Sequence, residues 1–175
     1  MFRIIADEPD RLLFPTRPGR VVVVRGFFHD AADEAVRAAT EAAVARLVAS
    51  GLCRSIEPAE LPASFAQVHA MHRRIMAVDA ADYHRADFER EPQSYSPTVA
   101  ALVREGLGIS AVDYAAALRH QVRFQRDIDE WLTPDTIALM PATVTPAPGP
   151  ETTGDPRFNS PWSYAGVPAA TIPCG

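Results

Sequence analysis

The stretch "GRVVVVRG", residues 19–26, decides the fold class of this chain. Four consecutive β-branched residues, Val21 to Val24, lie between two glycines, and such a run is typical of a strand that is buried on both faces of a sheet. A segment with helical spacing follows, and "CRSIEPAEL" (53–61) then predicts a second, shorter strand. The three segments form one β-α-β unit, for which a right-handed crossover is strongly expected.

The helix between the two strands has recognisable ends. Asp30 can cap its first turn, and Asp33 lies where a negative charge is favoured by the helix dipole. Gly51 is placed to end the helix, because glycine readily adopts the left-handed conformation of a helix C-terminus. The apolar residues at helical spacing are Val36, Ala39, Ala43, Val44, Leu47 and Val48.

The middle of the chain predicts three more helices. Ser64 can cap a long helix that runs to Glu91-Pro92, with Phe65, Val68, Ile75 and Met76 on one face. Ser96-Pro97 begins a short helix that ends at Gly106. "SAVD" (110–113) is a capping box that begins a third helix, which closes before Pro134. The apolar side of this third helix is expected to hold Tyr114, Leu118, Val122, Ile128 and Leu132.

The last forty residues mix strand patterns with a proline-rich segment. "TIALMPA" (136–142) is a third strand candidate, and "PATVTPAPGPETTGDP" cannot form regular structure. A helical turn is expected near residues 159–165, followed by a strand at "AATIPC" (169–174). We therefore predict an α/β protein whose strands flank a helical middle. Residues 1–175 are treated as a single domain without internal repeats.

Composition narrows the classes of function. Hydrophobic residues make up 47% and charged residues 22%, and the net charge of −5 gives no reason to expect a nucleic-acid partner. No apolar run approaches the ~20 residues of a membrane span, and the acidic start "MFRIIADEPD" argues against secretion. With only Cys53 and Cys174, we expect two reduced, buried thiols in a cytoplasmic protein. All 17 basic residues are arginine, so no lysine base is available in this chain.

Histidines give only the outline of a metal site. His69 and His72 lie three residues apart on a predicted helix, and His84 and Asp87 follow. A zinc site needs three or four converging ligands, and no further ligand stands at a typical spacing. We therefore expect histidines on the polar side of a charged helix and no metal ion.

Other catalytic arrangements are also missing. Nothing places Glu89, Glu91 and Asp127 on opposite sides of a cleft, as acid–base catalysis by paired carboxylates requires. The eight serines include no Gly-x-Ser-x-Gly elbow and no Ser-x-x-Lys pair, and the chain has no glycine-rich phosphate loop. No cofactor is expected. Residue chemistry alone thus indicates an α/β core without a catalytic centre.

"FNSPW" (158–162) is the strongest candidate for a binding segment. Phe158, Asn159 and Trp162 follow the proline-rich loop and precede the last predicted strand. Loops at strand ends are where α/β proteins build binding sites, so these three residues are our substrate-binding candidates. The alternative is packing, in which Phe158 and Trp162 anchor the loop to the core.

The segment "FNSPWSYAGVPAATIPCG" (158–175) resembles the carboxy-terminal part of the amidase signature family, serine amide hydrolases with a large α/β/α fold. "GRVVVVRGFFHDAADEAVRAATEAAVARLVASG" (19–51), residues 82–121 and "LMPATVTPAPGP" (139–150) are similar to earlier family elements in the same order. The resemblance covers residues 18–175. It implies a partial α/β/α sheet with flanking helices, which corresponds to the substrate-side part of an amidase.

The resemblance also implies which parts of the reaction this chain does not carry. The family uses a serine nucleophile, a second serine on a cis peptide bond and a lysine base, all amino-terminal to the matched region. This chain has no Ser-Ser pair and no lysine. We therefore expect a truncated or split amidase that is inactive alone. Completed by an amino-terminal half, it would act on a small-molecule amide, and alone it could self-associate through an exposed sheet edge.

Two alternatives remain open. The chain could be a non-catalytic remnant that serves as a binding or interaction module. It could also be a relative of the glutamyl-tRNA amidotransferase A subunit, although "FNSPWSYAGVP" (158–168) looks more like the stand-alone hydrolases and the acidic net charge disfavours a tRNA role.

Overall fold

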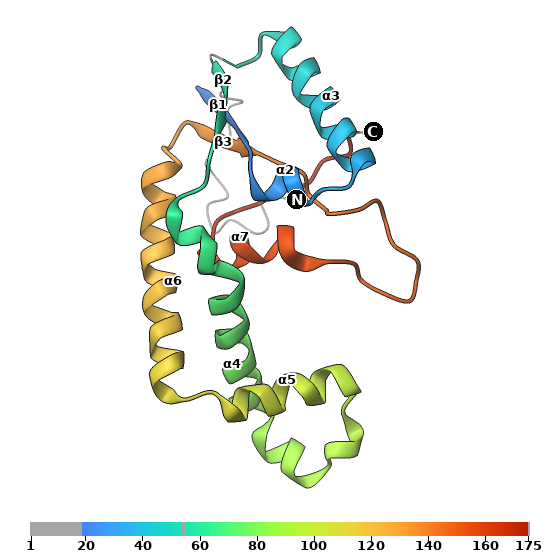
Figure 1. Cartoon of the computed structure of the whole chain (residues 1–175), viewed down its shortest axis with the longest axis vertical. Helices are drawn as coiled ribbons and strands as arrows, with labels where there is room; N and C mark the ends of the chain where they lie inside the picture. Colours follow the sequence, from blue (N-terminus) through green and yellow to red (C-terminus); the bar gives the residue numbers. More distant parts are fainter. Residues whose placement is uncertain (1–18, 54, 175) are drawn as a thin grey trace, which may run out of the picture.

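The computed structural model describes residues 19–53 and 55–174. A small sheet with helix α3 lies at one end of the elongated molecule. The other end is a helical arm made of α4, α5 and α6 (Figure 1). The acidic amino-terminal stretch, residues 1–10, lies outside the described residues. The elements are β1 (Arg20–Val24), α2 (Phe27–Ala31), α3 (Glu34–Ser50), β2 (Ser55–Ala59), η1 (Ala63–Gln67), α4 (Val68–Arg90), η2 (Pro92–Ser94), α5 (Pro97–Gly108), α6 (Ala111–Trp131), β3 (Thr136–Leu139), η3 (Pro156–Phe158) and α7 (Ser160–Ala165).

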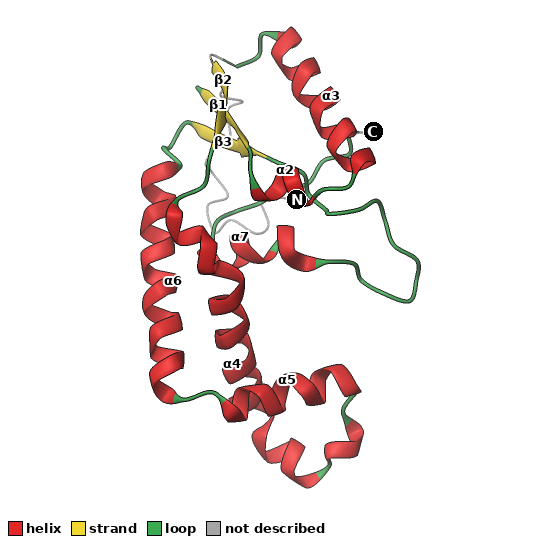
Figure 2. Cartoon of the chain, viewed as in Figure 1, coloured by secondary structure: helices red, strands yellow, loops and turns green. Residues whose placement is uncertain are grey.

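The sheet is parallel and has β1 in its centre. β2 and β3 flank β1 in the order β2-β1-β3, with Val22 opposite Glu57 on one side and Ala138 on the other. Val21 to Val24 are at most 7% exposed, as their β-branched run predicts. The α/β class and the strand–helix–strand unit are therefore confirmed, with α2 and α3 as the crossover between β1 and β2 (Figure 2).

The start of the crossover differs from the sequence prediction. Asp30 lies inside the short helix α2, whose buried residue is Phe28. The cap of α3 is Asp33, whose side chain accepts a hydrogen bond from the Val36 backbone N–H at 2.9 Å. Because Phe28 is buried, residues 27–31 form a separate short helix, and the cap of α3 lies three residues after Asp30, at Asp33. Gly51 ends α3 in the left-handed conformation, with φ of 63°, as predicted.

In the helical arm, two of the predicted helix caps are observed and a third is not. Ser96 and Ser110 cap α5 and α6 through hydrogen bonds from the Val99 and Asp113 backbone N–H groups. Ser64 does not cap a helix: it lies in η1, and α4 begins four residues later at Val68.

The packing of the arm differs in two further details. α5 continues past Gly106 to Gly108, and Gly106 is buried against α4. On α6, Val122 is 67% exposed, and the inward face is formed by Ala117, His120, Phe124 and Ile128. On α4, Met76 is 38% exposed although its sequence neighbours Met71 and Ile75 contact the core.

The carboxy-terminal part contains one clear correction. β3, the irregular proline-rich segment and the short helix α7 are formed as expected. The predicted strand at 169–174 is not formed, and Pro168 to Pro173 are all exposed, with Ile172 78% exposed. A strand needs a hydrogen-bonded neighbour, and the described chain offers this segment none.

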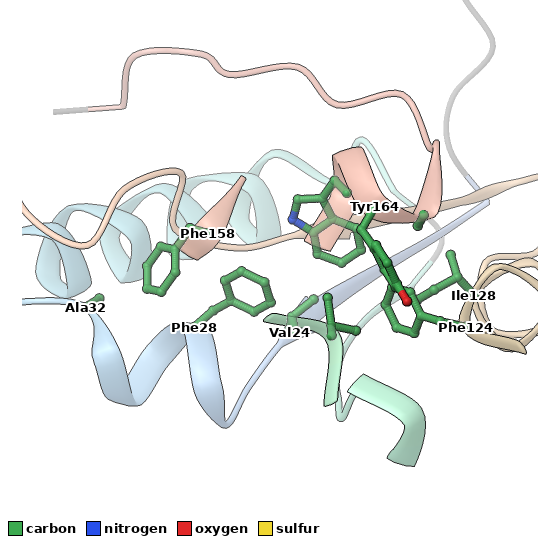
Figure 3. Close-up of a cluster of buried hydrophobic side chains, with 10 residues drawn as sticks. Val24, Phe28, Ala32, Phe124, Ile128, Phe158 and Tyr164 are labelled. Atoms are coloured by element: carbon green, nitrogen blue, oxygen red, sulfur yellow. The ribbon is translucent and has the colours of Figure 1, made fainter. Parts of the chain in front are cut away.

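The main core joins both ends of the described chain. Side chains from β1, α2, α4, α6, η3 and α7 form it, and Figure 3 shows Phe28 and Phe158 next to each other at one side of the cluster. The buried members of this core are Val24, Phe28, Ala32, Val68, Phe124, Ile128, Phe158, Trp162, Tyr164 and Ala165.

No helix among the described residues is long and apolar enough to cross a membrane. Both cysteines are free and half-buried, so they are less buried than expected.

Candidate functional site

The candidate segment, Asp155 to Gly166, is fixed locally by prolines and side-chain caps. Asp155 accepts a hydrogen bond from the Arg157 backbone N–H at 2.9 Å and forms an ion pair with the Arg157 guanidinium at 2.6 Å. Pro161 stands in the first turn of α7, where its missing N–H costs nothing. Gly166 ends the helix with a φ of 72°, a conformation that favours glycine.

The three predicted binding residues have different surroundings. Phe158 is 1% exposed and Trp162 8% exposed, and both pack on Phe28 of α2. The Trp162 and Phe28 rings are stacked at 5.7 Å between centroids, and the Phe158 and Phe28 rings lie 5.0 Å apart. Asn159, between them in sequence, is exposed. Thus the aromatic pair anchors the segment to the core, and Asn159 is presented outward.

A buried polar cluster supports this segment from behind. His120 of α6 is 4% exposed, and its two ring nitrogens lie 2.9 Å from the Tyr164 hydroxyl and 3.0 Å from the Ser64 carbonyl oxygen. The Tyr164 hydroxyl also lies 3.2 Å from the Ala117 carbonyl oxygen, and the Gln121 amide donates to the Tyr164 carbonyl at 3.0 Å. These bonds connect η1, α6 and α7.

Sequence reasoning missed this cluster. Its one available signal was the position of His120, three residues after Ala117 and four before Phe124, on what proves to be the buried face of α6. The apolar pattern alone placed that face around Leu118 and Val122, because a histidine at a core position does not contribute to a hydrophobic period.

Burial sets the electrostatics of the cluster. Desolvation lowers the pKa of His120 below its ordinary 6.5, and the nearby Arg123 lowers it further, while the bond to the Ser64 carbonyl and the charge of Asp127 act in the opposite direction. Desolvation also raises the pKa of Tyr164 to about 12. Both side chains are therefore neutral near pH 7.

The remaining histidines do not form a metal site. Within residues 19–53 and 55–174, no group of three or more histidine, cysteine and acidic residues is placed to hold a metal ion. His69 hydrogen-bonds the Arg157 carbonyl at 2.9 Å, and His84 pairs with the Tyr95 hydroxyl at 3.1 Å. His72 lies beside the Tyr164 ring, and its pKa is lowered by burial and by His69.

The three candidate carboxylates are separated from one another. Asp127 accepts a hydrogen bond from the Ser64 hydroxyl at 2.6 Å, whereas Glu89 and Glu91 are exposed at the far end of α4. Among the described residues, no serine hydroxyl is hydrogen-bonded to a histidine ring. The described part of the chain therefore holds no serine–histidine pair.

A pocket of about 160 Å³ lies apart from the candidate segment. It is found between the carboxyl end of β1 and α3, where Val23, Arg25, His29 and Val44 contribute to its walls. None of Phe158, Asn159 or Trp162 lines it.

Comparison with known proteins gives this arrangement a context. No protein-family model matches the chain. An amidase of Pseudomonas putida is 28% identical over 167 residues, an alignment that covers 87% of this chain and 35% of the relative. The chain is related to the amidases. The resemblance predicted from the sequence is thereby confirmed.

Solved structures show the same fold. A crystal structure described as an amidase superposes with a TM-score of 0.73 at 21% identity and covers 90% of this chain and 39% of that chain. A second structure has a TM-score of 0.71 at 25% identity, with coverage of 84% and 34%. It is described as an inhibitor-bound vestigial protein complex that reveals the evolutionary origins of an s-triazine catabolic enzyme. The chain spans between a third and two fifths of the length of the relative and the solved chains that it matches.

Proposed function

We propose that this chain is the substrate-side portion of an amidase of the amidase signature type, which hydrolyses a non-peptide C–N bond. One observation carries the proposal: amidases match nearly the whole chain, but the chain covers only 35% of the Pseudomonas putida relative. The missing lysine agrees with it, because a lysine base cannot be supplied by any of the 175 residues. Catalytic groups must therefore come from another polypeptide segment.

The chemistry proposed for the completed enzyme is acyl transfer. A serine oxygen outside this chain attacks the amide carbonyl, the C–N bond breaks, and the amine departs with a proton. Backbone N–H groups stabilise the oxyanion, and water then cleaves the acyl ester to give a carboxylate. The role assigned to this chain is to shape the substrate site with residues 155–166.

The geometry supports two different roles within that segment, anchoring to the core and contact with the substrate. Phe158 and Trp162 are held in the core, so they fix the position of the segment. Asn159 is exposed between them, and its carboxamide can donate and accept hydrogen bonds to an amide substrate. We propose Asn159 as the residue that contacts the substrate, with the two aromatic rings as its support.

Exposed surface supports the requirement for a second segment. Residues 168–173 have a strand-like sequence and are exposed, and α3 has no buried residue among its 17. Both outer strands of the three-stranded sheet also have a side without a strand neighbour among the described residues. Free strand edges are a natural route for pairing with another polypeptide or a second copy. The free thiols of Cys53 and Cys174 support a cytoplasmic location.

The test uses the chain alone and a chimaeric enzyme, here called the graft, in which this chain replaces the matching part of an amidase. The purified chain should not hydrolyse an aryl amide, since loss of a complete catalytic set costs about 10⁶-fold in serine hydrolases. Residues 19–175 should then replace the matching third of the Pseudomonas putida amidase. We expect the folded graft to hydrolyse the amide and its Asn159→Ala form to lose activity.

Three results would contradict the proposal. One is turnover by the chain alone that a single serine substitution abolishes. A second is a graft that melts cooperatively but lacks activity. A third is an active graft in which Asn159→Ala changes neither kcat nor KM, and that result overturns the role of Asn159 only.

A non-catalytic subunit is the second candidate. It is favoured by the likeness to a chain from a vestigial protein complex, at 25% identity in both solved forms of that complex. In this case the chain would bind a partner polypeptide without contributing to hydrolysis. An inactive but folded graft, together with stable binding of a partner in the cell, would favour this candidate.

A further inference from the structure

Three elements meet at the buried ring of His120. Its Nε2 lies 3.0 Å from the Ser64 carbonyl oxygen in η1, and its Nδ1 lies 2.9 Å from the Tyr164 hydroxyl in α7. A carbonyl oxygen can only accept, so Nε2 must carry the proton that is donated to Ser64. In the neutral ring, Nδ1 is then an acceptor, so the single Tyr164 hydroxyl proton is divided between Nδ1 at 2.9 Å and the Ala117 carbonyl oxygen at 3.2 Å. The contacts thus select a single tautomer.

We propose that His120 is a positioning residue, whose neutral Nε2–H form holds α7 in place and whose protonation loosens that placement. α7 carries Trp162, so the proposal concerns the support of the candidate segment. It rests on the proposed function only in the assumption that this segment contacts the substrate.

Protonation reverses one bond of the cluster. With both ring nitrogens donating, the Tyr164 oxygen must accept from Nδ1, and its own proton is donated to the Ala117 carbonyl oxygen alone, at 3.2 Å. The imidazolium would also be enclosed, because the neutral ring is only 4% exposed.

The charged and titratable groups around the ring are few. Arg123 of α6 opposes a positive charge on His120, and Asp127 of α6 favours it. Asp127 is partly occupied by the Ser64 hydroxyl at 2.6 Å. From α7 the facing group is Tyr164, and the His72 ring of α4 lies 5.6 Å from the Tyr164 ring between centroids. Burial, the largest effect, and Arg123 outweigh the Ser64 hydrogen bond and Asp127, so the pKa of His120 is lowered.

The direction of the pH effect follows from this shift. In the unfolded chain His120 has its ordinary pKa of 6.5, and in the folded chain its pKa is lower. Between these two values the unfolded state binds more protons than the folded state. The contribution of His120 to stability is therefore complete above pH 6.5 and is lost as the pH falls through the folded pKa.

Trp162 provides a direct readout of α7. In a Trp131→Phe background it is the one remaining tryptophan, since the chain has two. Emission should shift to longer wavelength as the pH is lowered from 8 to 5, with a midpoint below 6.5. His120→Gln should abolish the shift, because a carboxamide can donate to Ser64 and accept from Tyr164 without titrating. His84→Gln, on the distant arm, should leave the shift unchanged.

A second measurement covers the case in which His120→Gln does not fold. Nitrogen chemical shifts of the wild-type chain should show the Nε2–H tautomer of His120 at neutral pH, and the α7 backbone amides should titrate together with that ring. The proposal is overturned by an Nδ1–H tautomer, by a His120 pKa of 6.5 or higher, or by α7 amides that do not follow the titration. It is also overturned if folded His120→Gln keeps the emission shift or if His72→Gln alone removes it.

The readouts separate this proposal from the proposed function. Emission and nitrogen shifts report on α7 without any substrate or partner. An inactive graft with an intact pH response would reject the amidase role and keep the positioning role of His120. An active graft would keep the amidase role. If its kcat is equally independent of pH from 5 to 8 in the wild-type and His120→Gln forms, the positioning role of His120 is rejected.

Discussion

Gly106 marks a close approach of two helices, and replacing it with alanine tests how tightly they pack. A Cβ atom built at Gly106 of α5 would lie 1.9 Å from the Ala77 carbonyl oxygen of α4 and 2.7 Å from the Ala81 Cβ. An ordinary contact begins near 3.4 Å, so α4 and α5 would have to separate by about 1.5 Å (3.4 − 1.9). That movement would open the small core of Ala81, Phe88, Ala100 and Val103.

The magnitude follows from two opposing effects. Overpacking of this kind costs about 1–3 kcal/mol, and the rigid backbone at Ala77 places Gly106→Ala at the upper end. Alanine in place of a helical glycine recovers about 1 kcal/mol of helix propensity. We expect a net loss of about 2 kcal/mol, which lowers the melting temperature by about 4–8 °C in a chain of this length.

Gly108→Ala is the matched control. Gly108 lies in the same helix, and nothing stands within 4 Å of the position that a Cβ atom would take there. This variant should melt at or slightly above the wild-type temperature, since it gains propensity without a clash. Thermal unfolding followed by circular dichroism at 222 nm measures both. If the two variants melt within one degree of each other, the close packing of α5 on α4 is wrong.

Three further outcomes are expected. Val22→Asp should unfold the chain, because Val22 is 0% exposed and the substitution buries an unpaired charge; a melt near that of wild type would reject the central position of β1. Asp33→Ala should cost about 0.5–2 kcal/mol in a denaturant titration while Asp30→Ala stays near wild type, and equal losses would reject Asp33 as the cap of α3. Sedimentation of the purified chain should show self-association that Ile172→Asp weakens, and a monomer at high concentration with strongly protected amides in residues 168–174 would contradict open strand pairing.

Local chemistry explains which features of the fold could be predicted. Val21 to Val24 specify a buried strand by themselves, because no other short element suits four successive β-branched residues. Ser96, Ser110 and Gly51 act on backbone groups within three residues of themselves, so their roles are visible in sequence.

Predictions failed where a distant contact decides the outcome. Ser64 has the chemistry of a cap, but its hydroxyl is hydrogen-bonded to Asp127, 63 residues away. Gly106 has the chemistry of a helix stop, but it is kept small by the backbone of α4. The buried face of α6 includes His120, which the apolar pattern did not indicate, because Ser64 and Tyr164 satisfy both of its ring nitrogens inside the core. None of these partners can be read from the neighbouring sequence.

The candidate site shows the same division. The position of the 158–162 segment after a proline-rich loop was visible, whereas its support by His120 and Tyr164 was not. The sequence left two interpretations of Phe158 and Trp162 open, and their burial against Phe28 agrees with packing. The role of Asn159 toward a substrate remains a prediction that the graft experiment addresses.

Two segments have apolar patterns that the described chain does not bury. α3 has three valines and one leucine at helical spacing, yet Val48 is 57% exposed, and Ile172 in the strand-like segment 169–174 is 78% exposed. Burying one such side chain fully is worth about 1.5–3 kcal/mol, so covering these side chains would stabilise the assembly that we propose. Both segments lie on the same end of the molecule, where the Arg46 guanidinium of α3 donates to the Cys174 carbonyl at 2.6 Å. A polypeptide that adds a strand beside residues 169–174 would therefore also contact α3, which makes this end the expected interface with the catalytic segment.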